Sequence, residues 1–170
     1  MSGDVVGETI QVSVVTSDLY RGLDNLVALG LGPFQVFQIG PENCTEQTFR
    51  GEPAPWSLLL AFATAGAMMW EVIQPLEGPS VYREFLDAGH EGIHHVAVDG
   101  HGLPYEQRAA ELESHGYTCV MDGRAFGGQA PFGYFHNDDP AAPVIELFQF
   151  PDDFAPVPDE WYPGPPGAAG

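Results

Sequence analysis

Lysine is absent from this chain, and positively charged side chains of any kind are few. The 170 residues contain five arginines against 24 aspartates and glutamates, which gives a formal net charge of −19. A surface of this sign repels nucleic acid and anionic membranes, so we expect neither as a partner. A coenzyme A thioester would find few groups to hold its phosphates. Either a solvated acidic surface or a preference for cationic partners explains this balance.

Cysteines and long apolar runs are also scarce. Cys44 and Cys119 are far apart and have no CxxC spacing, so structural disulfides and zinc-ribbon chemistry are poorly supported. No apolar run reaches the roughly 20 residues of a membrane span. Residues 1–8 lack the basic start and apolar segment of a secretory signal. We therefore expect a cytoplasmic protein.

A hydrophobic content of 44% predicts a folded globular chain, and its elements repeat. Each half has the order strand, helix and three strands, and each is too small to bury its own sheet. We expect an α+β fold in which two βαβββ modules pair to form one half-open curved barrel. The expected strands cover residues 9–16, 34–39, 56–63 and 67–74 in the first half, and 92–99, 117–122, 131–136 and 143–150 in the second. The expected helices run from a cap at Ser17 or Asp18 to about Leu29, closed by Gly30, and over residues 103–115.

The remaining segments set the organisation of the chain. The first unit spans residues 1–90 and ends in a linker helix at about 80–88, and the second spans 91–150. Residues 40–55 form a long polar loop with room for a short edge strand. Residues 151–170 are rich in Pro and Gly, and we expect a mostly irregular extension that packs against the body or a neighbour. A homodimer is left open.

Four polar residues interrupt apolar strand patterns at equivalent places in the repeat. Gln11 and His95 occupy the first strand of each half, and Glu71 and Glu146 occupy the last. Because side chains alternate faces along a strand, the repeat brings these four towards one point inside the sheet. His94 is expected to point to the opposite face, towards the core or a helix. The pattern predicts a metal site.

The ligand types suit a fairly hard divalent cation. One imidazole, two carboxylates and one amide oxygen fit a single Mn, Fe, Co, Ni or Zn ion with open positions for water or substrate. The alternative is that Glu71 and Glu146 face solvent from an antiparallel sheet, which is common for a single strand glutamate. The symmetry of the set favours the metal.

At these residues the chain resembles the vicinal oxygen chelate superfamily, which includes glyoxalase-type lyases, methylmalonyl-CoA epimerase, extradiol dioxygenases and bleomycin-resistance proteins. The resemblance covers about residues 8–150, and its most specific parts are EVIQPLEGPS at 71–80 and GIHHVAV at 92–98, which look like the epimerase-like branch. It implies metal ligands at the positions of Gln11, Glu71, His95 and Glu146. It also implies a metal that chelates adjacent oxygens of the substrate and stabilises an oxyanion.

Two positions depart from the family pattern. The first ligand is commonly histidine in this branch, and the neutral amide of Gln11 is a weaker donor that favours harder ions. The carboxylate base implied for the third strand is missing from residues 56–63. We therefore expect the scaffold to transfer but not the methylmalonyl-CoA reaction.

The leading hypothesis is a divalent-metal-dependent enzyme that moves a proton on a small, oxygen-rich organic substrate. The reaction would be an isomerisation, an epimerisation or a lyase step, with Glu71 or Glu146 as a ligand that also acts as base. Two alternatives remain open. One is a non-catalytic protein that sequesters a cationic natural product, as bleomycin-binding members do. The other is a scaffold that has lost its metal, for which Gln11 is the best indication.

Further candidates lie around the expected pocket. His136 is a candidate general acid or base beside Tyr134, although histidines at strand ends are often only solvated. Glu46 and Arg50 lie in the long loop, where Arg50 could bind a substrate carboxylate; a plain exposed loop is the alternative. Trp56 and Tyr134 are expected to contact substrate, or to be ordinary core aromatics.

Overall fold

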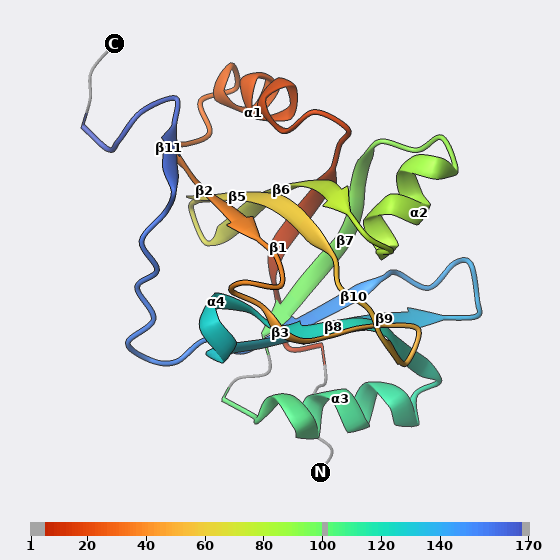
Figure 1. Ribbon diagram of the computed structural model, residues 1–170. Coiled ribbons are helices and arrows are strands. Elements are labelled where there is room, and N and C mark those ends of the chain that lie inside the picture. Colours follow the sequence, from red (N-terminus) through yellow and green to blue (C-terminus); the bar gives the residue numbers. More distant parts are fainter. Residues whose placement is uncertain (1–5, 100–101, 168–170) are drawn as a thin grey trace.

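The computed structural model describes residues 6–99 and 102–167, which form one curved, eleven-stranded sheet with its two longest helices on the outer face (Figure 1). The outermost residues of the first and third expected units, 1–5 and 168–170, lie outside the described part. The first repeat consists of β1 (Glu8–Val15), α1 (Leu19–Val27), β2 (Phe34–Ile39), β5 (Ser57–Ala65) and β6 (Met68–Glu77). The second consists of β7 (Gly92–Asp99), α3 (Tyr105–Ser114), β8 (Tyr117–Arg124), β9 (Ala130–Asn137) and β10 (Ile145–Phe148). The helix α2 (Val81–Asp87) joins them.

The strand order shows the two-fold relation that the sequence predicts. The central part of the sheet runs β2-β5-β6-β1-β7-β10-β9-β8, so the two repeats meet at the antiparallel pair β1–β7. Each repeat places its last strand parallel to its first, between that strand and the preceding hairpin partner. The α+β fold of paired βαβββ modules is confirmed.

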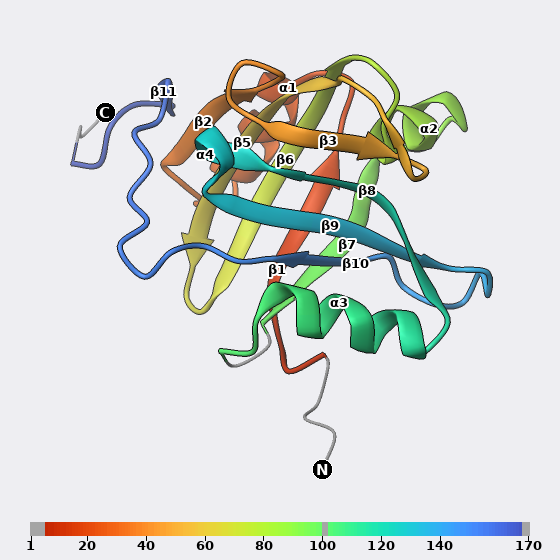
Figure 2. The same ribbon diagram turned by 60° about the horizontal axis from the view of Figure 1, so that its bottom comes forward.

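Hydrophobic core lies on both the inner and the outer face of the sheet. On the outer face, Leu19 and Leu23 of α1 pack on β2, β5 and β6, and Leu112 of α3 packs on the second repeat. Figure 2 shows α3 running alongside β9 and β10 of the second repeat. The inner faces of the two repeats turn towards each other and share a third core cluster, which includes Ile73 and Tyr82. The site lies in this inner space.

Short strands from elsewhere extend both ends of the sheet. The loop at residues 40–55 contains β3 (Thr45–Phe49) and β4 (Glu52–Pro53), and β3 pairs with β8 of the second repeat. The tail contributes β11 (Glu160–Tyr162), which pairs with β2. Because only residues 40–44 connect β2 to β3, the two ends of the sheet lie within about 20 Å of each other. This connection curves the sheet into its half-open shape.

The loop at residues 40–55 does contain short strands, the described part of the tail is irregular apart from β11, and helix α1 begins where its cap predicts. The Asp18 carboxylate accepts a hydrogen bond from the backbone N–H of Arg21. The chain leaves the helix through Gly30, whose φ of 87° lies in the left-handed region that glycine adopts most readily. Within the described residues no helix has the length and apolar character of a membrane span.

Leu23→Ala tests the outer core under α1. Leu23 is fully buried among side chains of three strands, so truncation should lower the free energy of unfolding by about 2–5 kcal/mol. Leu29→Ala is the matched control, because Leu29 is 79% exposed just beyond the same helix and should change stability by less than about 0.5 kcal/mol. Urea denaturation measures both, and equal losses would contradict the assigned packing.

Candidate metal centre

The four polar residues predicted as ligands come together on the inner face. Gln11 lies on β1, Glu71 on β6, His95 on β7 and Glu146 on β10, and none is more than 6% exposed. Their neighbours on the same strands alternate as expected. Ile73 shares the inner face with Glu71, whereas the intervening Val72 packs against α1. Strand alternation therefore placed these residues correctly.

The pairing register explains why the four side chains converge. In the first repeat Glu71 pairs with Ser13 of β1, and in the second Glu146 pairs with Ala97 of β7. Across the centre of the sheet, Gln11 pairs with Ala97 and Ser13 with His95. These pairs exchange under a two-fold axis that relates Gln11 to His95 and Glu71 to Glu146, which is the equivalence that the repeat predicts.

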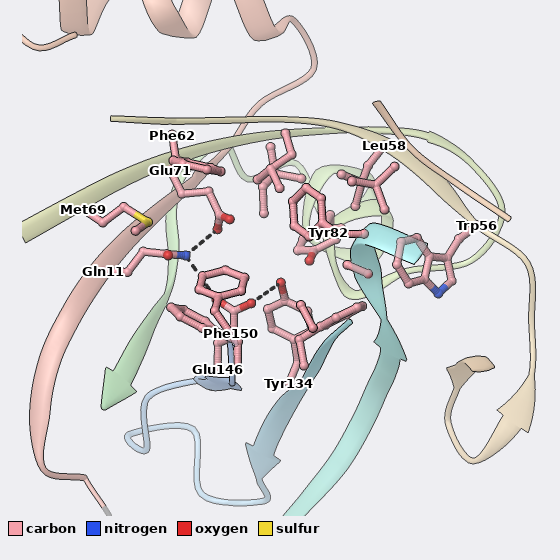
Figure 3. Close-up of a pocket in the computed structure, with 18 residues that line it drawn as sticks. Gln11, Trp56, Leu58, Phe62, Met69, Glu71, Tyr82, Tyr134, Glu146 and Phe150 are labelled. Carbon is pink, nitrogen blue, oxygen red and sulfur yellow. Dashed lines mark hydrogen bonds between the residues drawn. The ribbon is translucent and has the colours of Figure 1, made fainter. Parts of the chain in front are cut away.

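The polar ends of the four side chains lie close together, and Figure 3 shows three of them, those of Gln11, Glu71 and Glu146. The Gln11 Nε2 donates to Glu71 Oε2 at 2.8 Å and to Glu146 Oε2 at 3.1 Å. The His95 Nε2 lies 3.4 Å from Glu71 Oε2 and 3.2 Å from Glu146 Oε2. One oxygen of each carboxylate therefore points at the same small volume as the imidazole nitrogen.

Each carboxylate also has a hydroxyl donor of its own. Ser13 Oγ donates to Glu71 Oε2, and Tyr134 Oη donates to Glu146 Oε1 at 2.9 Å. Ser13 is not among the site residues that the sequence predicts, although its place two residues after Gln11 puts it on the inner face. It also missed Tyr82 of α2, which is 1% exposed and packs edge to face on Tyr134 at 5.4 Å.

Burial and neighbouring charges shift the pKa values of His95 and Glu146. Burial by itself would lower the pKa of His95, but hydrogen bonds with Glu146 and Glu71 and their negative charges raise it to about 9. Burial, and then the charge of Glu71, raises the pKa of Glu146. A dication bound between the two carboxylates would take over this role of the protons and favour the ionised form of both.

The donor set fits a metal ion. One atom each from Glu71, His95 and Glu146 lie within 4.8 Å of one another, and all three residues are buried. Two carboxylate oxygens and one imidazole nitrogen are common ligands of Mn, Fe, Co, Ni and Zn. The Gln11 amide could add its oxygen after turning over, since its nitrogen now faces both carboxylates.

His94 does not point simply to the face opposite His95, as regular strand alternation predicts. The β1–β7 register passes from the pair Ser13–His95 to the pair Val14–Ile93, so His94 is the extra residue of a β-bulge. A bulge interrupts the alternation of faces, and the Nδ1 atoms of His94 and His95 consequently lie 2.9 Å apart. The expected packing against a helix is confirmed, because the ring contacts Phe85 of α2 at 4.9 Å.

A largely apolar pocket opens beside the four polar residues. It encloses about 610 Å³ of space between protein atoms, a volume that includes part of the open solvent at its mouth. Gln11, Glu71, Glu146 and Tyr134 supply its polar wall. The apolar lining includes Trp56, Leu58, Leu60, Phe62, Met69, Phe126, Phe132, Phe148 and Phe150.

The other predicted site residues divide into two groups. Trp56 and Tyr134 line the pocket, as a substrate-contacting role requires. Glu46 and Arg50 are exposed outside it, and Arg50 forms a bidentate ion pair with Glu84 of α2 at 2.8 and 2.9 Å. His136 is half-buried outside the pocket lining, and burial lowers its pKa. The roles of these three residues stay predictions.

Tyr134→Phe tests how the site holds Glu146. Loss of the hydrogen bond to Glu146 Oε1 should lower the affinity for a divalent cation by roughly 10- to 100-fold, as expected for a group that orients a ligand. Chelator competition measures this affinity. Tyr117→Phe, in the outer core near α3, is the matched control and should have no effect. Equal affinities in both variants would show that the hydrogen bond from Tyr134 does not support metal binding by Glu146.

Comparison with known proteins identifies the family. The model of the Glyoxalase/Bleomycin resistance protein/Dioxygenase superfamily matches residues 10–135, which contain three of the four predicted ligands. The chain belongs to this superfamily. No sequence among the curated proteins matches it. The superfamily includes epimerases and other enzymes, and its members typically bind a divalent metal, which agrees with the Glu-His-Glu group.

Solved structures share the superfamily fold at low sequence identity. A hypothetical protein from Bacillus halodurans is 18% identical, with a TM-score of 0.60 over 88% of this chain and 98% of that one. Methylmalonyl-CoA epimerase from Mycobacterium tuberculosis is 19% identical, with a TM-score of 0.57 over 89% and 93%. A variant of the Streptomyces coelicolor epimerase, in complex with 2-nitronate-propionyl-CoA, is 17% identical, with a TM-score of 0.59 over 89% and 99%. These similarities establish the fold of this superfamily member.

Proposed function

We propose that this protein is a divalent-metal-dependent enzyme that transfers a proton on a small organic molecule with adjacent oxygens. The observation that carries the proposal is the convergence of Glu71, His95 and Glu146 beside an apolar pocket that the two carboxylates help to line. The epimerase neighbours act by the same class of reaction on coenzyme A thioesters. Isomerase, epimerase and lyase chemistry all share this proton-transfer step.

The metal and its ligands would have separate tasks. When bound, the cation would polarise the substrate oxygens and stabilise negative charge that develops there. Glu71, His95 and Glu146 would hold the cation, with Gln11 as the fourth ligand. The apolar walls would exclude water from the reacting atoms, which strengthens each electrostatic interaction in the site.

Glu71 is the better candidate for the base. Glu146 uses both carboxylate oxygens, one towards Tyr134 and the other towards Gln11 and His95. Hydrogen bonds in the described part of the chain reach only Oε2 of Glu71, which leaves Oε1 available for a proton. The inward side chains of β5 are apolar and offer no other carboxylate.

The two tyrosines would act as hydrogen-bond donors in this scheme. Burial raises the pKa of Tyr82 and of Tyr134 well above the ordinary range, so both hydroxyls stay protonated at neutral pH. Tyr134 fixes the Glu146 carboxylate. Tyr82 lines the same pocket and presents a second donor to a bound molecule.

Hydrogen exchange in heavy water tests the proposed reaction. Metal-loaded protein should catalyse deuterium incorporation, followed by NMR, at the carbon next to the carbonyl of at least one compound in a panel of α-hydroxyketones and 2-substituted acyl thioesters. Protein treated with a chelator should lose this activity. Absence of exchange for every compound in the panel would contradict the proposed proton-transfer activity.

Sequestration of a cationic natural product is the second candidate function. Two carboxylates and many aromatic rings line the pocket, and no arginine does, which suits an aromatic cation. Under this alternative, a planar cationic dye should bind metal-free protein in the pocket and a metal ion should compete with it. The enzyme hypothesis places a metal ion on the same two carboxylates, so exchange activity of the metal-loaded protein, and not this competition, separates the two candidate functions.

A further inference from the structure

We propose that the pocket accepts a molecule with an aromatic or bulky apolar body next to its paired oxygens, and that it does not accept coenzyme A thioesters. The position of the oxygens rests on the proposed function. The preference for the body rests on the pocket walls alone, so the two can fail separately.

One wall is a row of large side chains from β5. Leu58, Leu60 and Phe62 are two residues apart and therefore point to the same inner face. Phe62 pairs directly with Glu71, so this apolar row begins beside a proposed metal ligand. Figure 3 shows Leu58 on the side away from Gln11, whereas Phe62 lies beside Glu71, so the row leads away from the polar cluster.

The opposite wall is aromatic and comes from the second repeat. Phe148 and Phe132 pair with each other on β10 and β9, two residues along each strand from the pair Glu146–Tyr134 and so on the same face. Both rings line the pocket, as does Phe150 just beyond β10. A flat molecule held at the carboxylates would therefore lie between aliphatic side chains on one side and aromatic rings on the other.

A third group of rings narrows the pocket from the loop and tail. Phe126 lies in the glycine-rich segment α4 (Ala125–Gly128), packs edge to face on Phe37 at 5.3 Å and contacts Phe154 at 5.0 Å. Phe154 stacks on Phe150 at 4.3 Å. Phe126 has a φ of 53°, a backbone conformation that residues other than glycine rarely adopt. With this backbone conformation, the ring of Phe126 forms part of the pocket lining.

The charges needed to hold a nucleotide are committed elsewhere. Arg21 and Arg50 form ion pairs with Glu91 and Glu84. The other arginines donate to backbone carbonyl oxygens: Arg83 to Pro75 and Leu76, Arg108 to Val98, and Arg124 to Gly128. With a net charge of −19, the protein would repel a diphosphate rather than bind it. A coenzyme A moiety therefore lacks a partner.

A pair of probes isolates the apolar body. 2-Hydroxyacetophenone and hydroxyacetone carry the same adjacent oxygens, but only the first has a phenyl ring. Calorimetric titration of metal-loaded protein should show the phenyl compound binding at least roughly tenfold more tightly, because its ring is buried. Coenzyme A should neither bind nor compete. Equal affinity of the two ketones, no binding of the phenyl compound at millimolar concentration, or competition by coenzyme A would overturn the proposal.

Two adjacent leucines provide matched variants. Leu60→Ala removes part of a pocket wall and should lower the affinity for the phenyl compound by roughly fivefold or more, without changing the affinity for hydroxyacetone. Leu59→Ala makes the same change on the outer face of β5, under α1, and should leave both affinities unchanged. Equal effects of the two variants would place the ring outside this pocket.

The same titrations separate this proposal from the metal hypothesis. If the wild-type protein holds no metal but still prefers the phenyl compound, the proposed function fails and the apolar subsite stands. If metal binds and the ketones do not differ, the subsite fails and the metal site stands.

Discussion

Replacing His95 by alanine should lower the affinity for a divalent cation by at least roughly 100-fold. The imidazole is the nitrogen donor of the proposed ligand set, and its Nε2 lies 3.2 Å from Glu146 Oε2 and 3.4 Å from Glu71 Oε2. The loss should appear in chelator-competition titrations and as the disappearance of any metal-dependent rise in Tm.

Two further variants guard this prediction against misfolding. His95→Gln keeps a hydrogen-bond donor beside the buried carboxylates, so it should preserve the fold while still lowering the affinity for the metal ion. His115→Ala is the matched control, because His115 is an exposed residue at the end of α3. Tight metal binding by both folded His95 variants would show that His95 is not a ligand.

Glu71→Gln should lower the rate of hydrogen exchange by roughly 100- to 10,000-fold at saturating metal. The account assigns this carboxylate the proton-accepting role because its Oε1 receives no hydrogen bond within the described residues, whereas both oxygens of Glu146 are engaged. The amide keeps the size of the side chain but cannot accept the proton.

Glu146→Gln separates the base from the ligand. Both variants lose one carboxylate of the pair, so both should bind metal more weakly. At saturating metal, however, Glu146→Gln should retain more exchange activity than Glu71→Gln, as measured by NMR in heavy water. Equal rates, or a larger loss for Glu146→Gln, would contradict the assignment of Glu71 as base.

The repeat was the part of the sequence that predicted most. Two copies of one strand pattern implied a two-fold axis, and that axis related Gln11 to His95 and Glu71 to Glu146 before any contact was known. Alternation then assigned each of them to the inner face. These rules depend only on the two-residue period of a strand, so they hold wherever the strand is regular.

The rest depends on irregular backbone and on contacts between distant segments. His94 lies at a β-bulge, which breaks the alternation that predicted its direction. The pairing of β3 with the far repeat depends on the path of a loop. Tyr82 reaches the pocket from a linker helix whose sequence does not reveal its orientation. Ser13 was on the predicted face, but only its pairing with Glu71 shows its role.

The metal content of the untagged, wild-type protein tests the central claim most directly. Elemental analysis after purification without added chelator should find about one divalent ion of the series Mn, Fe, Co, Ni or Zn per chain, and the Glu71→Ala and His95→Ala variants should have lost it. Wild-type protein without metal, and without a rise in Tm when these ions are added, would contradict the account.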